Sequence, residues 1–323
     1  MRAIQVAEFG GPDVLRPAEL ADPQAGPGQV VVGLAAADVI YLDVLLRRGW
    51  GRDFFPREPP YVPGGGGAGR VLSVGAGVDV GWVGRTVLAR GTGGYAERMV
   101  TDLDDVVAVP DGVDATTAAA VLHDGPTALG LVDVGAVADG EWVLVSAAAG
   151  GAGTWLVQIA RSAGARVVAA ARGERKLSLA RELGAEAVVD YSEQGWAEKV
   201  RALTGGGGVD LAYDGAGGDL GREVFSTVAE SGRFVTYGTA NGGLVAIDPQ
   251  LAEQRRVTVR NPLLEDGPPD QSTVRALLEK ALQLVAQGRV RPVIGATYPL
   301  DRASAAHRAL EDRATAGKTL LLT

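Results

Sequence analysis

The segment Trp142-Val143-Leu144-Val145-Ser146-Ala147-Ala148-Ala149-Gly150-Gly151-Ala152-Gly153-Thr154 decides how this chain folds. Its apolar first half is typical of a buried strand, and a helical pattern of apolar residues follows the glycines. Backbone N–H groups at such a strand-to-helix loop, together with the helix dipole, can bind a pyrophosphate. A tight turn without a ligand is the alternative interpretation. We expect the cofactor to be bound here by Ala149, Gly150, Gly151, Ala152 and Gly153.

Strands and helices alternate on the C-terminal side of this loop. Six strands joined by helical crossovers predict a doubly wound parallel sheet, because right-handed β–α–β units cover both faces of a sheet with helices. The fold class is therefore α/β, with a Rossmann dinucleotide-binding domain at residues 121–263. The predicted strands are 142–147, 166–171, 187–190, 209–213, 233–237 and 257–260, and the predicted helices are 154–163, 174–183, 196–203 and 220–229.

The chain on either side of this domain has a different pattern. Short apolar runs before residue 120 are separated by glycine and proline, which predicts a partly open β-barrel. We expect the tail to return to this barrel, so that residues 1–120 and 264–323 form one domain. The predicted strands are 1–6, 29–36, 69–74, 85–89, 96–100, 106–109, 290–294 and 319–322, and the predicted helices are 115–122 and 273–287. A further predicted helix, 127–134, falls within residues 121–263.

The composition excludes several classes of function. Asp and Glu outnumber Lys and Arg by 39 to 31, and the net charge of −8 disfavours binding to nucleic acid or to an anionic membrane. Cysteine is absent and only two histidines occur, which excludes disulfides, thiolate zinc sites, iron–sulfur clusters and a His-rich metal site. The longest apolar stretch, residues 30–46, contains Asp38 and Asp43, so it fits buried strand and turn rather than a membrane span. No secretion signal is visible, and we expect a soluble cytoplasmic protein.

Several segments resemble one family, in the same order along the chain. The loop 146–153 and the helix start 154–160 resemble the AAAGGVG-type loop of the zinc-independent quinone oxidoreductases, a branch of the medium-chain dehydrogenase/reductase superfamily. The resemblance implies a GroES-like catalytic domain, built from both termini, around the Rossmann domain. It extends to residues 8–12, 26–30, 61–64, 94–97, 183–185, 208–210 and 288–292.

Two departures from the superfamily pattern bear on metal binding. Zinc alcohol dehydrogenases of the superfamily have Cys where Ile40 falls, and a Gly-His-Glu motif where Gly64-Gly65-Gly66 falls. Neither Ile nor Gly can ligate zinc, so we expect no metal site. The quinone oxidoreductase branch usually carries Asn at the Ile40 position, where it contacts the nicotinamide ribose region, and this contact is missing here.

The end of the second Rossmann strand bears on which nicotinamide cofactor is bound. NAD-binding domains usually place Asp or Glu there, whereas this chain has Ala171, followed by Arg172 and, on the next helix, Lys176. Two cations favour the 2′-phosphate of NADPH, although both can instead be solvated surface charges. The resemblance implies that Lys176 and Tyr191 contact this phosphate. We also expect cofactor contacts from Thr127, Gly215, Tyr237, Gly238 and Thr239.

Aromatic residues make up only 5% of the chain, yet five of them gather between residues 41 and 61. We interpret them as an apolar wall of the substrate pocket, able to stack a flat lipophilic substrate. The alternative is a small local core beneath a proline-rich loop. The five residues are Tyr41, Trp50, Phe54, Phe55 and Tyr61.

Two residues in or beside this wall are candidates for catalysis. The phenol of Tyr41 could donate a proton to the oxyanion that forms when hydride adds to a conjugated carbonyl, and a buried Tyr capped by a backbone carbonyl is the alternative. Asp43 matches an acidic residue often found near the cofactor in the resembled family, and a turn or ion-pair role is the alternative. The pair His123-Asp124 is a candidate proton relay, or else a cap of the helix that follows.

These expectations combine into a reaction. Without a metal to polarise a simple ketone, hydride transfer needs a substrate that is already electrophilic, so we expect NADPH-dependent reduction of a quinone or an α,β-unsaturated carbonyl compound. Enoyl reduction of a natural-product or acyl intermediate is a second candidate, and an NADPH-binding protein with little turnover is a third. We also expect a homodimer through the last Rossmann strand, residues 257–260, because an uncovered edge invites pairing with a second copy; a covered edge is the alternative.

Overall fold

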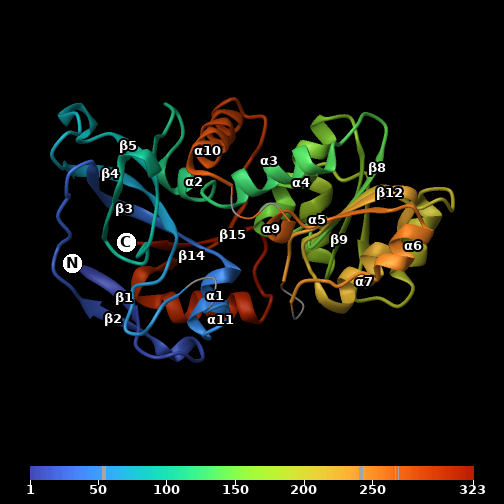
Figure 1. Cartoon of the computed structure of the whole chain (residues 1–323), viewed down its shortest axis with the longest axis horizontal. Coiled ribbons are helices and arrows are strands. Elements are labelled where there is room, and N and C mark those ends of the chain that lie inside the picture. Colours follow the sequence, from blue (N-terminus) through green and yellow to red (C-terminus); the bar gives the residue numbers. More distant parts are fainter. Residues whose placement is uncertain (53–55, 240–242, 266, 268) are drawn as a thin grey trace. The chain divides into compact units, whose positions relative to one another are not determined.

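The computed structural model describes residues 1–52, 56–239, 243–265, 267 and 269–323, and it divides into two compact units (Figure 1). Residues Met1–Pro126 and Gln271–Thr323 form one unit, which we call the discontinuous unit. Residues Thr127–Asp270 form the other, the central unit. In the described part of the chain, no helix is long and apolar enough to cross a lipid bilayer.

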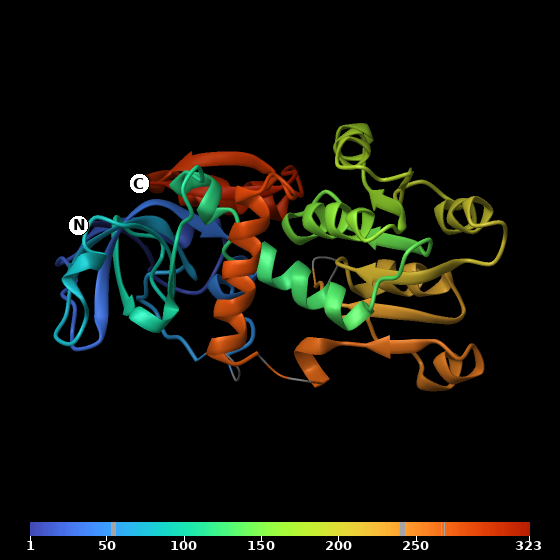
Figure 2. The ribbon, with the colours of Figure 1, turned by 90° about the horizontal axis from the view of Figure 1, so that it is seen from above.

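A six-stranded parallel sheet forms the middle of the central unit. Its strand order is β10-β9-β8-β11-β12-β13, which confirms the predicted doubly wound sheet. Figure 2 shows β13, in orange, at one border of this sheet. The strands are β8 (Trp142–Ser146), β9 (Arg166–Ala171), β10 (Ala187–Asp190), β11 (Val209–Asp214), β12 (Val228–Thr236) and β13 (Thr258–Arg260). The helices are α3 (Asp124–Gly135), whose first three residues belong to the discontinuous unit, α4 (Gly151–Ser162), α5 (Glu174–Glu182), α6 (Trp196–Leu203), α7 (Gly218–Ser226), α8 (Pro249–Gln254) and α9 (Pro262–Glu265).

The core of the central unit explains why these strands are almost uninterrupted apolar runs. Helix α4 packs against β8 and β9, and α7 packs against β11 and β12, so the central strands are buried. Phe225 of α7 meets Phe234 of β12 edge to face, with ring centroids 5.4 Å apart.

Several boundaries in the central unit differ from the predicted ones, and three of them have a clear physical reason. Helix α4 begins at Gly151 rather than residue 154, because the glycines after Gly150 already belong to its first turn. Helix α7 ends at Ser226, since the hydroxyl of Thr227 bonds back to the carbonyl of Val224. Strand β12 therefore begins at Val228, before an irregularity at which Ser231 has a φ of 63°.

A seven-stranded sheet forms the discontinuous unit. Its order is β14-β15-β3-β4-β5-β7, with β6 also paired to β3, and β1 and β2 form a separate pair. Strand β15 pairs antiparallel with β3, so the tail returns to this unit as predicted. The strands are β1 (Arg2–Val6), β2 (Leu15–Glu19), β3 (Gln29–Val39), β4 (Gly66–Val74), β5 (Thr86–Arg90), β6 (Arg98–Asp102), β7 (Val106–Ala108), β14 (Ile294–Pro299) and β15 (Lys318–Leu322). The helices are α1 (Tyr41–Arg47), α2 (Ala115–Ala119), α10 (Gln271–Ala286) and α11 (Ala303–Glu311).

Two predictions for this unit were wrong. Residues 41–47 form helix α1 instead of strand and turn, because the Asp43 carboxylate accepts a hydrogen bond from the Ile40 amide and caps the helix. Strand β14 begins at Ile294, beyond Pro292, rather than near residue 290. The sequence analysis also did not predict β2 or α11. A Cβ on Gly295 would lie 1.4 Å from the carbonyl oxygen of Ala316, so only glycine fits where β14 approaches the segment before β15.

Candidate functional site

The predicted pyrophosphate loop lies between β8 and α4. Ala147 has a φ of 50°, and its carbonyl accepts the Gly150 amide at 2.8 Å, which closes the turn. Gly150 is extended and precedes the first turn of α4, whose amides have no partner within the helix. A Cβ on Gly153 would lie 2.4 Å from the Ala147 carbonyl oxygen. Glycine at position 153 therefore lets helix α4 pack directly on the loop. Together, the candidate pyrophosphate-binding residues form one continuous loop and helix start, which we call the phosphate cradle: Ala149, Gly150, Gly151, Ala152 and Gly153.

A buried carboxylate, Asp214, joins the carboxyl ends of three strands beside this loop. It accepts hydrogen bonds from the hydroxyl of Ser146 on β8 at 3.1 Å and from the hydroxyl of Thr236 on β12 at 3.0 Å. It also accepts the amides of Ala216 and Gly217. Burial raises the pKa of Asp214, although these donors oppose the rise. Sequence reasoning missed this residue, whose only signal is an acidic side chain at the end of a buried strand.

The Asp214 network positions three of the expected cofactor residues. The Gly215 amide donates to the Ser146 hydroxyl at 3.0 Å, and the amides of Tyr237 and Gly238 donate to the Asp214 carbonyl at 3.0 and 3.2 Å. A Cβ on Gly238 would lie 1.8 Å from the Gly215 carbonyl oxygen, so the loops after β11 and β12 touch. Thr239 follows directly. Thr127 is exposed in α3.

The ends of β9 and β10 carry the two candidate cations. Arg172 is exposed, Lys176 is half-buried in the first turn of α5, and the Tyr191 amide donates to the Ala171 carbonyl at 3.2 Å. The Gly173 amide donates to Asp190 Oδ2 at 2.8 Å. Burial favours the neutral acid of Asp190, but hydrogen bonds from Ser192 and Gly173 outweigh it and hold its pKa below the usual value. The structure thus brings Arg172, Lys176 and Tyr191 together at the carboxyl ends of β9 and β10. They lie next to the carboxylate of Asp190, which the sequence analysis did not consider.

The discontinuous unit holds a chain of buried polar groups, which we call the Asp43 relay. Tyr95 donates its hydroxyl proton to Asp43 Oδ2 at 3.1 Å, and its oxygen is 2.9 Å from His307 Nε2. Arg47 Nη1 is 3.4 Å from His307 Nδ1. Because Arg47 can only donate, Nδ1 accepts and Nε2 carries the proton that Tyr95 accepts. The relay therefore requires a neutral His307, and burial, helped by the nearby Arg47 charge, lowers its pKa to about 3.

Asp43 itself has a strongly perturbed environment. The residue is 5% exposed, and burial raises its pKa to about 6 despite the hydrogen bonds from Ile40 and Tyr95. Burial also raises the pKa of Tyr95, with a further contribution from Asp43. Asp43 thus caps α1, which agrees with the turn interpretation, and it carries a proton in mildly acidic solution.

The raised pKa of Asp43 predicts a pH-dependent stability difference. The stability that Asp43 contributes is fully present below the ordinary pKa of about 4 and is lost as the pH rises through about 6. We expect Asp43→Asn to gain about 2–3 kcal/mol of unfolding free energy relative to the unsubstituted protein between pH 4 and pH 8. Chemical denaturation at several pH values measures this difference, and a difference that stays constant over the range would contradict the assignment.

A second group of buried charges, which we call the Asp38 cluster, lies at the end of β3. Asp38 Oδ2 is 2.6 Å from His123 Nδ1, and Asp38 Oδ1 is 2.5 Å from Lys318 Nζ. Lys318 also pairs with Asp124 at 3.1 Å. Burial favours the neutral acid of Asp38, but the charges of Lys318 and His123 outweigh it and hold its pKa below the usual value. Burial raises the pKa of Asp124.

The aromatic residues of the predicted wall do not share one environment. Tyr41 is half-buried at the start of α1, and Trp50 is 49% exposed. Tyr61 bridges to Val6 and packs against the core of the discontinuous unit, which agrees with a local core role for that residue. Phe54 and Phe55 lie outside the described residues.

The positions of the superfamily's zinc ligands are sterically filled. A Cβ on Gly66 would lie 2.1 Å from the Ala89 carbonyl oxygen, and a Cβ on Gly65 would lie 2.7 Å from the His123 ring. Ile40 offers no ligand atom. Within the described ranges, no group of three or more His, Asp or Glu side chains is arranged to hold a metal ion.

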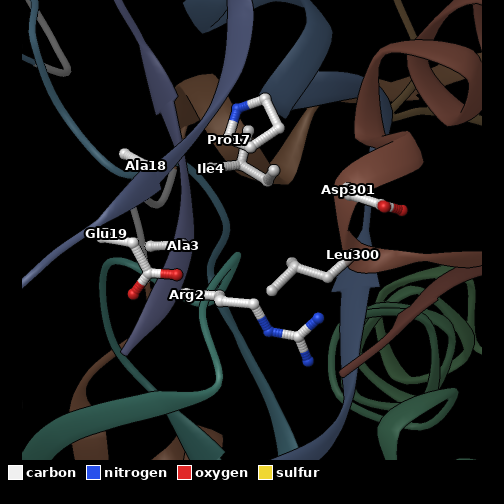
Figure 3. Close-up of a pocket in the computed structure, with 8 residues that line it drawn as sticks. All are labelled: Arg2, Ala3, Ile4, Pro17, Ala18, Glu19, Leu300 and Asp301. Carbon is white, nitrogen blue, oxygen red and sulfur yellow. The ribbon is translucent and has the colours of Figure 1, made fainter.

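A pocket of about 170 Å³ lies elsewhere in the discontinuous unit, between the β1–β2 pair and residues 300–301, which precede α11 (Figure 3). Ile4 and Leu300 are apolar residues of its lining, and Arg2, Glu19 and Asp301 also line it. It shares no residue with the Asp43 relay or the Asp38 cluster.

Comparisons with known proteins agree with this architecture. Residues 26–111 match the family model "Alcohol dehydrogenase GroES-like domain", and residues 151–296 match "Zinc-binding dehydrogenase". The chain is 32% identical to a quinone oxidoreductase of Pseudomonas aeruginosa, over 99% of both chains. It is also 32% identical to a 2-haloacrylate reductase of a Burkholderia species, over 99% of this chain and 98% of the other. A mycobacterial protein solved in complex with NADPH has a TM-score of 0.90 and 34% identity, over the full length of both chains.

Proposed function

The chain belongs to the quinone oxidoreductase branch of the medium-chain dehydrogenase/reductase superfamily, and from this premise we propose that it reduces a quinone or an α,β-unsaturated carbonyl compound with NADPH and without a metal. The observation that carries the proposal is the central unit's phosphate cradle together with Arg172 and Lys176 at the end of β9.

The donor set of the central unit fits NADPH. The α4 amides after Gly150 would hold the pyrophosphate, and Arg172 and Lys176 would hold the 2′-phosphate. The end of β9 itself carries Ala171 rather than an acidic residue. The loops fixed by Asp214 would hold the rest of the dinucleotide. When bound, NADPH supplies a hydride. The similar mycobacterial protein was crystallised with this cofactor.

The residues at the zinc-ligand positions favour an electrophilic substrate. One matching family model is named for zinc binding, but this chain has Ile40, Gly65 and Gly66 at the ligand positions and no cysteine. Without a Lewis acid to stabilise an alkoxide, alcohol oxidation loses its main source of transition-state stabilisation. A quinone or an enone needs no such polarisation, because its conjugation accepts the hydride's electron pair.

Two alternatives remain beside this proposal. The likeness to a 2-haloacrylate reductase supports reduction of a conjugated acid or acyl compound, which is chemically close to the enoyl reduction considered above. The third candidate, NADPH binding with little turnover, would leave the central unit's cradle intact and yield no product.

The proposal is tested with purified protein, NADPH and a panel of quinones, enones, conjugated acids and simple alcohols, followed at the nicotinamide absorbance with product analysis. We expect hydroquinone or a saturated ketone as the product. Dialysis against a strong chelator should leave the rate unchanged, with metal analysis before and after. Stoichiometric zinc with chelator-sensitive activity, or preferred oxidation of simple alcohols, would refute the proposal.

We also propose a homodimer formed through β13. In the described part of the central unit, β13 is the last strand of the sheet and pairs with β12. A border strand is a surface on which a second copy can add its own strand. We expect a dimer in sedimentation at micromolar concentration. A monomeric unsubstituted protein would exclude this arrangement.

A further inference from the structure

His123 combines two properties that a buried structural histidine lacks. Its side chain is 29% exposed, whereas its partner Asp38 is fully buried, and the two contact each other through Nδ1 at 2.6 Å. The other ring nitrogen, Nε2, lies beside Gly65, whose missing side chain leaves room for the ring. His123 thus has a carboxylate behind it and a second nitrogen on the side away from that carboxylate.

The capping interpretation of His123 does not account for this contact. Helix α3 begins at Asp124, yet the hydrogen bond of His123 goes to Asp38 on β3 rather than to a helix amide. Asp124 in turn pairs with Lys318 on β15. Residues of β3, β15 and the start of α3 therefore form one connected cluster that includes His123, which is more than a helix start requires.

Charged groups lie close to the imidazole. Asp38 and Asp124 supply two carboxylates, and Lys318 supplies one cation. When His123 is protonated, Nδ1 donates to Asp38 and Nε2 carries a second proton. An imidazolium that is held in place by a buried carboxylate can donate this second proton to a substrate.

We propose that His123 is the proton donor of the reduction, with Asp38 as a positioning residue; this inference rests on the proposed function. Hydride adds to the conjugated substrate, and the electron pair moves to the carbonyl oxygen. The N–H bond at Nε2 breaks as an O–H bond forms on that oxygen, giving an enol or a hydroquinone. The neutral imidazole then takes a proton from solvent, so one proton is consumed for each hydride transferred.

The first test removes the imidazole. With 1,4-naphthoquinone as substrate, His123→Ala should lower kcat about 100-fold or more, while KM and the Kd for NADPH change less than about 3-fold. Added imidazole should restore part of the lost rate, because the side chain is partly exposed. A structural role would not respond to imidazole. Unchanged kcat in His123→Ala, or a loss that imidazole does not reverse, would overturn the proposal.

The second test moves the imidazole without removing it. Gly65→Ala places a methyl group 2.7 Å from the Cε1 and Nε2 atoms of His123, so the ring must shift, and we expect about a 10-fold loss of kcat. Gly11→Ala is the matched control, since its added methyl meets nothing within 4 Å. Equal rates in the two variants would contradict the proposed position of the ring.

A binding readout separates this inference from the proposed function. The chain has two histidines, and 1-naphthol, whose hydroxyl stands for that of a hydroquinone, should shift the NMR signal of the His123 ring but leave the buried His307 unchanged. An unsubstituted protein that reduces no quinone or enone refutes both the function and the inference. Normal reduction without a shift at His123 refutes the inference alone.

Discussion

Replacement of Lys318 by methionine is expected to lower the free energy of unfolding by about 3–5 kcal/mol at pH 7. The Lys318 side chain is 4% exposed, and its ammonium lies 2.5 Å from Asp38 and 3.1 Å from Asp124. Burial alone would lower the pKa of Lys318, but the two carboxylates raise it above its usual value, so the group is charged. Methionine leaves two buried carboxylates without their cation. Chemical denaturation of the two proteins measures the loss.

The pH dependence of this loss gives an independent check. Without Lys318, burial raises the pKa of both carboxylates. At lower pH they become protonated, which removes the unpaired buried charges and restores stability to the folded variant. The stability difference should therefore shrink as the pH falls from 7 towards 4. Lys199→Met is the matched control, because Lys199 pairs with Glu193 on the surface and such pairs contribute less than about 1 kcal/mol. Equal losses in the two variants would contradict the buried ion-pair argument.

Replacement of Lys176 by alanine is expected to weaken NADPH binding roughly 10- to 150-fold while leaving NADH binding nearly unchanged. The range follows from a charge-assisted hydrogen bond of about 1.5–3 kcal/mol. Lys176 lies in the first turn of α5, close in sequence to Arg172, and Ala171 places no carboxylate at the end of β9. Both Kd values are measured by titration at fixed ionic strength, because screening weakens a phosphate contact.

The control for Lys176 removes a lysine of the same unit from another position. Lys199→Ala, on α6, should leave both affinities within about 2-fold of the unsubstituted protein, since its partner is the exposed Glu193. Arg172→Ala should resemble Lys176→Ala in direction. Equal affinities of the unsubstituted protein for NADH and NADPH, or equal losses for both cofactors in Lys176→Ala, would refute the assignment.

The central unit was the easier part to predict from the sequence. Strands β9 and β10 and helix α6 have the predicted bounds, because buried parallel strands and amphipathic helices follow from local periodicity. The Gly150 loop was also predictable, because consecutive residues between a strand and a helix form it and no distant partner is needed. The predicted end of α7 was wrong because a side chain bonds to the backbone there: the Thr227 hydroxyl donates a hydrogen bond to the Val224 carbonyl.

The polar groups of the discontinuous unit could not be paired from the sequence. Asp38 pairs with Lys318, and Tyr95 pairs with His307, so each pair joins residues that are far apart in the sequence. The periodicity of apolar residues carries no information about such distant partners. The sequence indicated Asp43 and the His123-Asp124 pair as candidates. It did not indicate that Asp43 shares its proton network with Tyr95, or that His123 is held by Asp38.

The position of β15 within its sheet has a consequence for biosynthesis. Strand β15 lies between β14 and β3, so β3 lacks one of its neighbours until the ribosome has made the segment from Lys318 onward. The central unit needs only residues 127–270 and can fold while translation continues. Until then, the part of β3 that pairs with β15 has unpaired backbone groups. A chaperone that covers exposed strand edges would protect the nascent chain during that interval.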